Sequence, residues 1–184
     1  MTQLLGISGS LRTGSLNTAL LRSAEELLPG GTSLSVASIE DIPLYNGDLD
    51  VDGGPVSVQA FKGQIAGADG LLIATPEYNF GIPGVLKNAI DWASRPGFKS
   101  VLAHKPVAIV GAAPGIVGTA RAQGQLKQVL LGTLSEVFPY PEVLVGKAHE
   151  RIQNGRLEDE QTRELLQKML EAYVSWIQRL PSRR

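Results

Sequence analysis

The sequence contains no cysteine among its 184 residues, and this absence excludes several kinds of chemistry. Without a thiol, the chain cannot build a disulfide, a zinc–thiolate site, an iron–sulfur cluster or a catalytic cysteine. Histidine is nearly as scarce, because only His104 and His149 occur. They lie far apart in the sequence and in polar surroundings, which favours a surface location for both. Spacing therefore supports no Ser-His-Asp triad.

Strong charge and long apolar runs are also missing. The formal net charge is -1 at pH 7, so electrostatics gives no reason to expect a nucleic-acid partner. No apolar run approaches the length that crosses a membrane, and the N-terminus lacks the basic and apolar segments of a signal peptide. We therefore expect a soluble, cytoplasmic protein without a membrane partner, folded as a single domain over residues 1–184.

Apolar runs alternate with helical patterns along the whole chain. The expected strands cover residues 4–8, 34–39, 70–75, 107–113 and 143–145. The expected helices cover residues 16–28, 55–66, 84–93 and 119–134, and a terminal helix has its acidic residues 158–160 near its start and its apolar stripe at residues 165–180. Strands that alternate with helices form a parallel sheet with helices on both faces. The apolar and polar alternation at residues 33–36 places the second strand at an edge of that sheet.

The junction between the first strand and the first helix is a candidate anion site. It contains Gly9, Ser10, Arg12, Gly14 and Ser15. A helix N-terminus has unpaired N–H groups and a partial positive charge, and hydroxyls and a guanidinium add donors that suit phosphate oxygens. These features together favour a phosphate site. The alternative is a plain connector in which Ser15 caps the helix and Arg12 is solvated.

A second polar loop, residues 76–83, follows the third expected strand and begins with Pro-Glu-Tyr-Asn. Taken alone, it is equally well explained as a turn in which Tyr78 and Phe80 are packing residues. In a parallel sheet, however, ligands bind beyond the carboxyl ends of the strands, where the strand order reverses. The loops after the first and third strands should therefore be neighbours. A third loop of small residues, 114–118, follows the fourth strand.

The polar segment at residues 40–55 partly imitates a calcium loop. Asp48, Asp50, Asp52 and Gly53 have the spacing of the first half of such a loop. The twelfth position is Gln59 instead of glutamate, and no helical pattern precedes the segment. A solvated turn is the simpler interpretation, and we expect no metal site.

Two common phosphate-binding motifs do not fit the first loop. It has neither the Gly-x-Gly-x-x-Gly of dinucleotide-binding folds nor the Gly-Lys-Ser/Thr of a P-loop. A mononucleotide fits better, with its phosphate in the first loop and a planar ring along the Tyr78 loop, as FMN binds in flavodoxin-like folds. We therefore expect an α/β fold, a flavodoxin-like three-layer sandwich whose five-stranded parallel sheet has the order 2-1-3-4-5.

Three motifs carry a resemblance to a known family. They are GSLRTGSLN at residues 9–17, PEYNFGIPGVLKNAIDW at 76–92 and the looser GTARAQGQLKQVL at 118–130. On these motifs the chain resembles the NADPH-dependent FMN reductase family, including its chromate and quinone reductases, over nearly its whole length. The second motif is the most specific, because its Pro-Glu-Tyr-Asn, its turn and its Lys-Asn-x-x-Asp-Trp occur together at the family's spacing.

The resemblance implies which residues hold FMN. One group would bind the phosphate and the ribityl chain: Ser10, Arg12, Ser15, Leu16 and Asn17. A second group would line the isoalloxazine ring, largely through backbone amides: Pro76, Glu77, Tyr78 and Asn79. No side chain is given a catalytic role, because the flavin carries the chemistry.

The resemblance also implies an oxidoreductase. NADPH or NADH would deliver a hydride to the flavin, and a quinone, free flavin, an azo compound or an oxidised metal anion would then take the electrons at the same face. Three alternatives stay open. The first is a flavodoxin-type electron carrier, although such carriers are usually more acidic. The second is a reductase for which FMN is a passing substrate, and the third is a regulatory module without turnover.

A second copy of the chain is the expected protein partner. The apolar residues of the helix at 84–93 cover more than one stripe: Val85, Leu86, Ala89, Ile90, Trp92 and Ala93. So wide a surface would pack on the sheet and leave some area for a homodimer or a tetramer. Family members often have an aromatic residue and an arginine where this chain has Gly124 and Lys127, so tetramer contacts of those residues do not transfer by resemblance.

Overall fold

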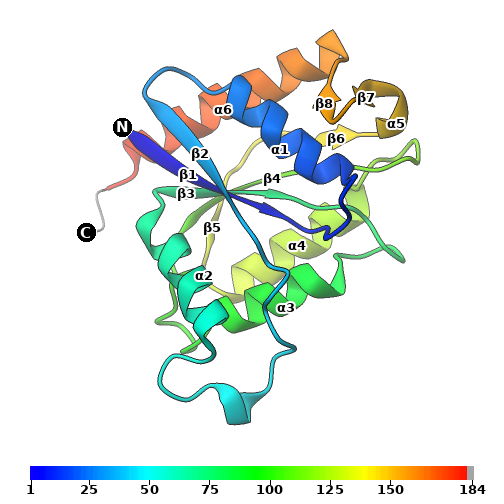
Figure 1. Cartoon of the computed structure of the whole chain (residues 1–184). Coiled ribbons are helices and arrows are strands. Elements are labelled where there is room, and N and C mark those ends of the chain that lie inside the picture. The colour runs from blue at the N-terminus through cyan, green and yellow to red at the C-terminus, as the bar shows by residue number, and fades with distance from the viewer. Residues whose placement is uncertain (182–184) are drawn as a thin grey trace.

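A parallel sheet between two layers of helices forms the centre of the computed structural model, which describes residues 1–181 (Figure 1). The spatial order of the strands is β2-β1-β3-β4-β5, and β6 also pairs with β4. Their bounds are β1 Thr2–Ser8, β2 Thr32–Ala37, β3 Gly70–Ala74, β4 Pro106–Ala112, β5 Glu136–Val137 and β6 Val143–Val145. The flavodoxin-like order and the edge position of β2 are confirmed.

Five long helices cover the sheet. They are α1 Leu16–Glu26, α2 Val56–Gly67, α3 Gly84–Ala93, α4 Ala120–Gly132 and α6 Glu160–Arg179. Figure 1 shows α1 and α6 on one face and α2, α3 and α4 on the other. The predicted bounds agree within a few residues for most of these helices. The terminal helix begins at the acidic residues that the sequence indicates, where Asp159 caps it by accepting a hydrogen bond from Thr162 N.

The fifth position of the sheet is shared by two short strands. The strand β5 pairs with the start of β4, and β6 pairs with its end. The sequence predicts only the second of these, so the sheet has six strands instead of five. A two-residue strand leaves no apolar run, and Pro139 and Pro141 interrupt the segment between the two strands.

Several small elements lie outside this sheet. The segment at residues 40–55 contains a single 3₁₀ turn, η1 Gly47–Leu49, in which Asn46 Oδ1 accepts a hydrogen bond from Asp48 N. A short helix, α5 Ala148–Arg151, precedes a hairpin of β7 Ile152–Gln153 and β8 Arg156–Leu157. Within residues 1–181, no group of three or more His, Cys, Asp or Glu side chains could hold a metal ion. No helix there is both long and apolar enough to span a membrane.

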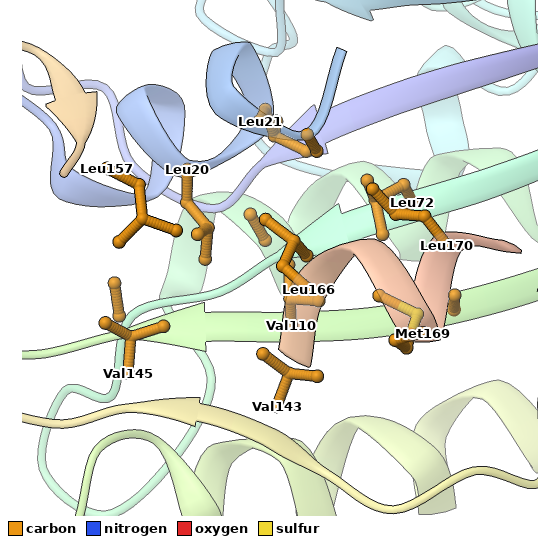
Figure 2. Close-up of a cluster of buried hydrophobic side chains, with 14 of the residues drawn as sticks. Leu20, Leu21, Leu72, Val110, Val143, Val145, Leu157, Leu166, Met169 and Leu170 are labelled. Carbon is orange, nitrogen blue, oxygen red and sulfur yellow. The ribbon is translucent and has the colours of Figure 1, made fainter. Parts of the chain in front are cut away.

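Two apolar cores lie on opposite faces of the sheet, because successive residues of a strand point to opposite sides. Leu72 of β3 and Val110 of β4 face α1 and α6, and Figure 2 shows Leu20, Leu166 and other side chains of those helices around them. The neighbouring strand residues face the other way and pack with α2, α3 and α4. Burial of both faces fixes the register of the central strands, so the loops at their carboxyl ends leave from a rigid edge.

A buried tyrosine fastens α6 to the sheet. The hydroxyl of Tyr173 donates a hydrogen bond to the Leu71 carbonyl at 2.9 Å. Burial raises the pKa of this hydroxyl well above its ordinary value, so it stays protonated and remains a donor. The ring lies against Gly70, where a Cβ atom would come 2.6 Å from the hydroxyl oxygen. This contact explains why glycine begins β3.

Candidate functional site

The loops after β1, β3 and β4 enclose a cleft at the carboxyl edge of the sheet. It contains about 370 Å³ of empty space that is continuous with solvent. Its lining residues come from these three loops and from the start of α1: Ser10, Arg12, Ser15, Leu16, Asn17, Pro76, Glu77, Tyr78, Ala112, Ala113 and Pro114.

Eight of the nine residues that the sequence singles out line this one cleft. The exception is Asn79, which lies exposed at the tip of the loop after β3. The two predicted groups are distant in the sequence, and the fold brings them together because β1 and β3 are adjacent parallel strands. Their contacts with a cofactor stay a prediction.

The first loop offers hydrogen-bond donors that no other described residue uses. Ser15 caps α1 by accepting from Thr18 N at 3.2 Å, as the connector interpretation expects. Within residues 1–181, no acceptor takes the backbone N–H groups of Leu16 and Asn17, and no carboxylate pairs with the exposed guanidinium of Arg12. An exposed cation beside the positive end of a helix forms a site for an anion.

Asn17 contributes to the cleft in a different way from its neighbours. Its side-chain amide donates to the carbonyl of Ala112 and accepts from the N–H of the same residue, both at 2.9 Å. The side chain is 2% exposed. These two bonds fix the orientation of the amide, although its nitrogen keeps a second hydrogen and its oxygen a second lone pair. The amide joins the start of α1 to the end of β4 and fixes the floor of the cleft.

The second loop folds into a tight hairpin. Two backbone hydrogen bonds of 3.0 Å join Tyr78 and Gly81. The residues between them, Asn79 and Phe80, have φ angles of 49° and 65°, which makes the turn one of the left-handed kind found in two-residue hairpins. A positive φ is strained for a bulky residue such as Phe80. The hairpin therefore needs support from elsewhere in the fold.

The side chain of Glu77 is directed to α4. Its Oε2 accepts hydrogen bonds from the backbone N–H groups of Arg121 and Ala122 at 3.0 and 3.1 Å, and Oε1 lies 3.3 Å from Arg121 Nη1. Glu77 thus caps the N-terminus of α4 from another segment of the chain. The guanidinium of Arg121 also lies 4.6 Å from the centre of the Phe80 ring. These contacts neutralise the one carboxylate among the lining residues and support the hairpin.

The third loop supplies lining residues that the sequence interpretation did not assign: Ala112, Ala113 and Pro114. Its backbone approaches the rest of the site closely, since a side chain at Gly111 would collide with Thr119 Oγ1 and the Thr75 carbonyl. The signal was present in the sequence, because a run of small residues followed the strand expected next to β3. It lacked a charged or hydroxyl side chain that would mark it as part of a binding site.

Residues 2–150 match the sequence model of the family described as NADPH-dependent FMN reductase. This match covers most of the chain. The protein belongs to that family. It is 49% identical over 179 residues to an NAD(P)H-dependent FMN reductase of Pseudomonas aeruginosa, covering 97% of this chain and 96% of that protein. The predicted family, an FMN-dependent NAD(P)H oxidoreductase, is confirmed.

Two further relatives agree in length and fold. A 2-hydroxy-1,4-benzoquinone reductase of a Burkholderia species is 44% identical over 172 residues, which are 93% of each chain. The solved structure of FerB, a flavoenzyme NAD(P)H:acceptor oxidoreductase of Paracoccus denitrificans, superposes with a TM-score of 0.88 at 38% identity, covering 97% of this chain and 98% of that one. These relatives are named as enzymes, which favours the oxidoreductase over the electron carrier and the regulatory module.

Proposed function

We propose that the cleft holds FMN and that the protein uses this cofactor to pass electrons from NAD(P)H to a quinone. The observation that supports the cleft as the FMN site is the set of free donors in the first loop. The guanidinium of Arg12 and the N–H groups of Leu16 and Asn17 have no acceptor within residues 1–181, and a phosphate monoester would supply several. The residues present therefore fit the group.

The three loops have separate tasks in this proposal. Ser10, Arg12 and the N-terminus of α1 hold the phosphate and the ribityl chain. Pro76, Glu77 and Tyr78 form one wall for the flavin ring, and the third loop supplies the other lining residues. Asn79 acts through the geometry of the turn instead of through contact. When bound, FMN supplies the hydride and electron transfer, and the protein supplies position and electrostatics.

The surface of these loops favours a flat, apolar electron acceptor. Tyr78 is 48% exposed and Phe80 is 71% exposed, and both follow β3 at the cleft. Leu11 and Ile116, in the other two loops, are exposed as well. Aromatic and aliphatic surface stabilises a quinone ring by burial, whereas a small hydrated anion gains little from it. We therefore propose quinones as the preferred acceptors, with azo compounds and chromate reduced less efficiently.

The test is to purify the protein, record its flavin absorption spectrum, and follow NADPH oxidation with and without a quinone and added FMN. We expect bound flavin and quinone-dependent oxidation of NADPH. A protein that binds no flavin under any condition would refute the proposal. Bound FMN without NADPH oxidation would point to a carrier, and turnover that consumes free FMN stoichiometrically would make FMN a substrate.

We also propose a homodimer, although its surface differs from the one that the sequence indicated. Most apolar residues of α3 are buried within the chain, and only Val85 is partly exposed. The loop at residues 43–54 covers Trp92: the indole N–H donates to the Pro43 carbonyl at 2.8 Å, and Tyr45 packs edge-on at 4.8 Å. The expected spare surface on α3 is thus occupied by the chain itself.

A group of exposed apolar side chains lies on the covering loop and at the start of α2. Leu44 and Val56 are each 83% exposed, and Leu49 and Val51 are exposed too. Such a group of apolar side chains favours association with a second copy. The substitutions Leu44→Arg and Val51→Arg should convert dimers to monomers in sedimentation equilibrium. Unchanged mass in both variants would place the interface elsewhere.

A further inference from the structure

The hairpin at residues 78–81 depends on α4 for its support. Its backbone hydrogen bonds are internal to the turn, and three successive residues, Tyr78, Asn79 and Phe80, are exposed. Two of them have the left-handed backbone that non-glycine residues rarely adopt. A strained turn that projects from a sheet keeps one geometry only where neighbouring groups hold it.

Three contacts with α4 provide that support. Glu77 caps the helix, and the Arg121 guanidinium lies over the Phe80 ring. One helical turn further on, Gln125 Oε1 accepts a hydrogen bond from Ile82 N at 2.7 Å. The hairpin is thus held before its tip, at its tip and after its tip by one face of a single helix.

Gln125 does not line the cleft, whereas Glu77 does. The amide oxygen of Gln125 lies so near the hairpin that a Cβ atom at Gly81 would come within 2.6 Å of it. Glycine at this position lets the amide oxygen reach the Ile82 N–H. Any effect of Gln125 on a ligand must therefore be transmitted by the hairpin backbone.

We propose that Gln125 is a positioning residue for the flavin cleft, holding the Tyr78 wall against α4 through Ile82. This role rests on the proposed function, because it assumes that FMN occupies the cleft. With the hydrogen bond in place, the hairpin enters the binding equilibrium already ordered, so FMN does not have to order it. Without it, the turn samples other conformations and binding becomes weaker.

The test compares three variants of the full-length protein. Gln125→Leu removes the acceptor, and Gln125→Glu keeps an oxygen at the same reach. Gln128→Leu makes the same change on the same helix, at an exposed residue whose side chain makes no hydrogen bond among residues 1–181. Hydrogen exchange of the hairpin amides is measured in the apoprotein, and the FMN dissociation constant is measured by quenching of FMN fluorescence.

We expect Gln125→Leu to accelerate hairpin exchange and to raise the FMN dissociation constant, each by roughly 3- to 10-fold, the equilibrium effect of one neutral hydrogen bond. Gln125→Glu should restore most of both values, and Gln128→Leu should change neither. Faster exchange with an unchanged dissociation constant would overturn the positioning role, as would unchanged exchange. A wild-type protein that binds no FMN would refute the proposed function. The results above, obtained with a wild-type protein that does bind FMN, would refute only the positioning role of Gln125, so the two failures are distinguishable.

Discussion

The first loop and the hairpin face the same cleft, yet they treat their polar groups in opposite ways. In the first loop, the Arg12 guanidinium and the N–H groups of Leu16 and Asn17 have no partner within residues 1–181. In the hairpin segment, the Glu77 carboxylate and the Ile82 N–H are both engaged with α4. This difference supports the proposal that the first loop binds an anion, whereas the hairpin provides a fixed wall of the cleft.

Substitution of Asn17 should have the largest effect on stability. This residue is an exception to the comparison, because it lies beside the first loop, at the start of α1, but its side chain supports the fold. Asn17→Ala leaves the buried N–H and carbonyl of Ala112 without partners, so the free energy of unfolding of the apoprotein should fall by about 2–4 kcal/mol. Urea denaturation measures this. The exposed amide variant Gln128→Ala is the control, and a loss below about 1 kcal/mol would show that the Ala112 bonds matter little.

Arg12 tests the free donors of the first loop. Arg12→Ala removes one charge-assisted bond to the phosphate, so FMN affinity should fall by about 1.5–3 kcal/mol with little change in stability. Arg22→Ala is the matched control, because Arg22 is an exposed arginine on α1. Equal FMN affinity of the Arg12 variant and the wild type would remove Arg12 from the phosphate site.

Substitution of Glu77 tests the contacts between the hairpin segment and α4. Glu77→Ala uncaps α4, so the free energy of unfolding should fall by about 1–2 kcal/mol, and Glu77→Gln should lose less because it keeps an acceptor oxygen. Thermal or urea unfolding of the apoprotein measures the loss. Glu25→Ala, at an exposed glutamate of α1, provides the reference. A Glu77→Ala protein as stable as this reference would mean that the cap contributes nothing.

Substitution of Gly124 should have the smallest effect on stability, and it tests whether a change in α4 that keeps the hairpin contacts leaves FMN binding intact. A Cβ atom added there meets nothing within 4 Å, so Gly124→Ala should raise the free energy of unfolding by about 0.5–1 kcal/mol. FMN affinity should stay the same, because the hairpin contacts are retained. Gly63→Ala in α2 is the matched helix control. Lower stability in the Gly124 variant alone would show that α4 tolerates no change beside Gln125.

The fold was largely predictable because its signals are local. Buried parallel strands appear as continuous apolar runs, and the helices between them follow their apolar stripes. The strand β5 was missed because two residues make no pattern. The proposed spare face of α3 was wrong for a different reason: apolar periodicity shows that a residue will be buried, but it does not show that the loop at residues 43–54 buries Trp92.

The location of the site was predictable from topology, whereas the tasks of its side chains were not. Parallel strands bring Ser10 and Pro76 to one cleft, and that follows from strand order. Asn17 bonds to a residue 95 positions away in the sequence, and Glu77 bonds to one 45 positions away. No local sequence pattern predicts such contacts. The sequence predicts that both residues contact the cofactor. The structure shows that the Asn17 side chain bonds to β4 and that the Glu77 side chain bonds to α4.

The central claim is that the first loop binds the phosphate of FMN, and the most direct test is to titrate the apoprotein with FMN and with riboflavin, which has the same ring without the phosphate. We predict that riboflavin binds at least about 10-fold more weakly, and that Arg12→Ala weakens FMN binding while leaving riboflavin binding unchanged. Equal affinity for the two flavins in the wild-type protein would contradict the claim.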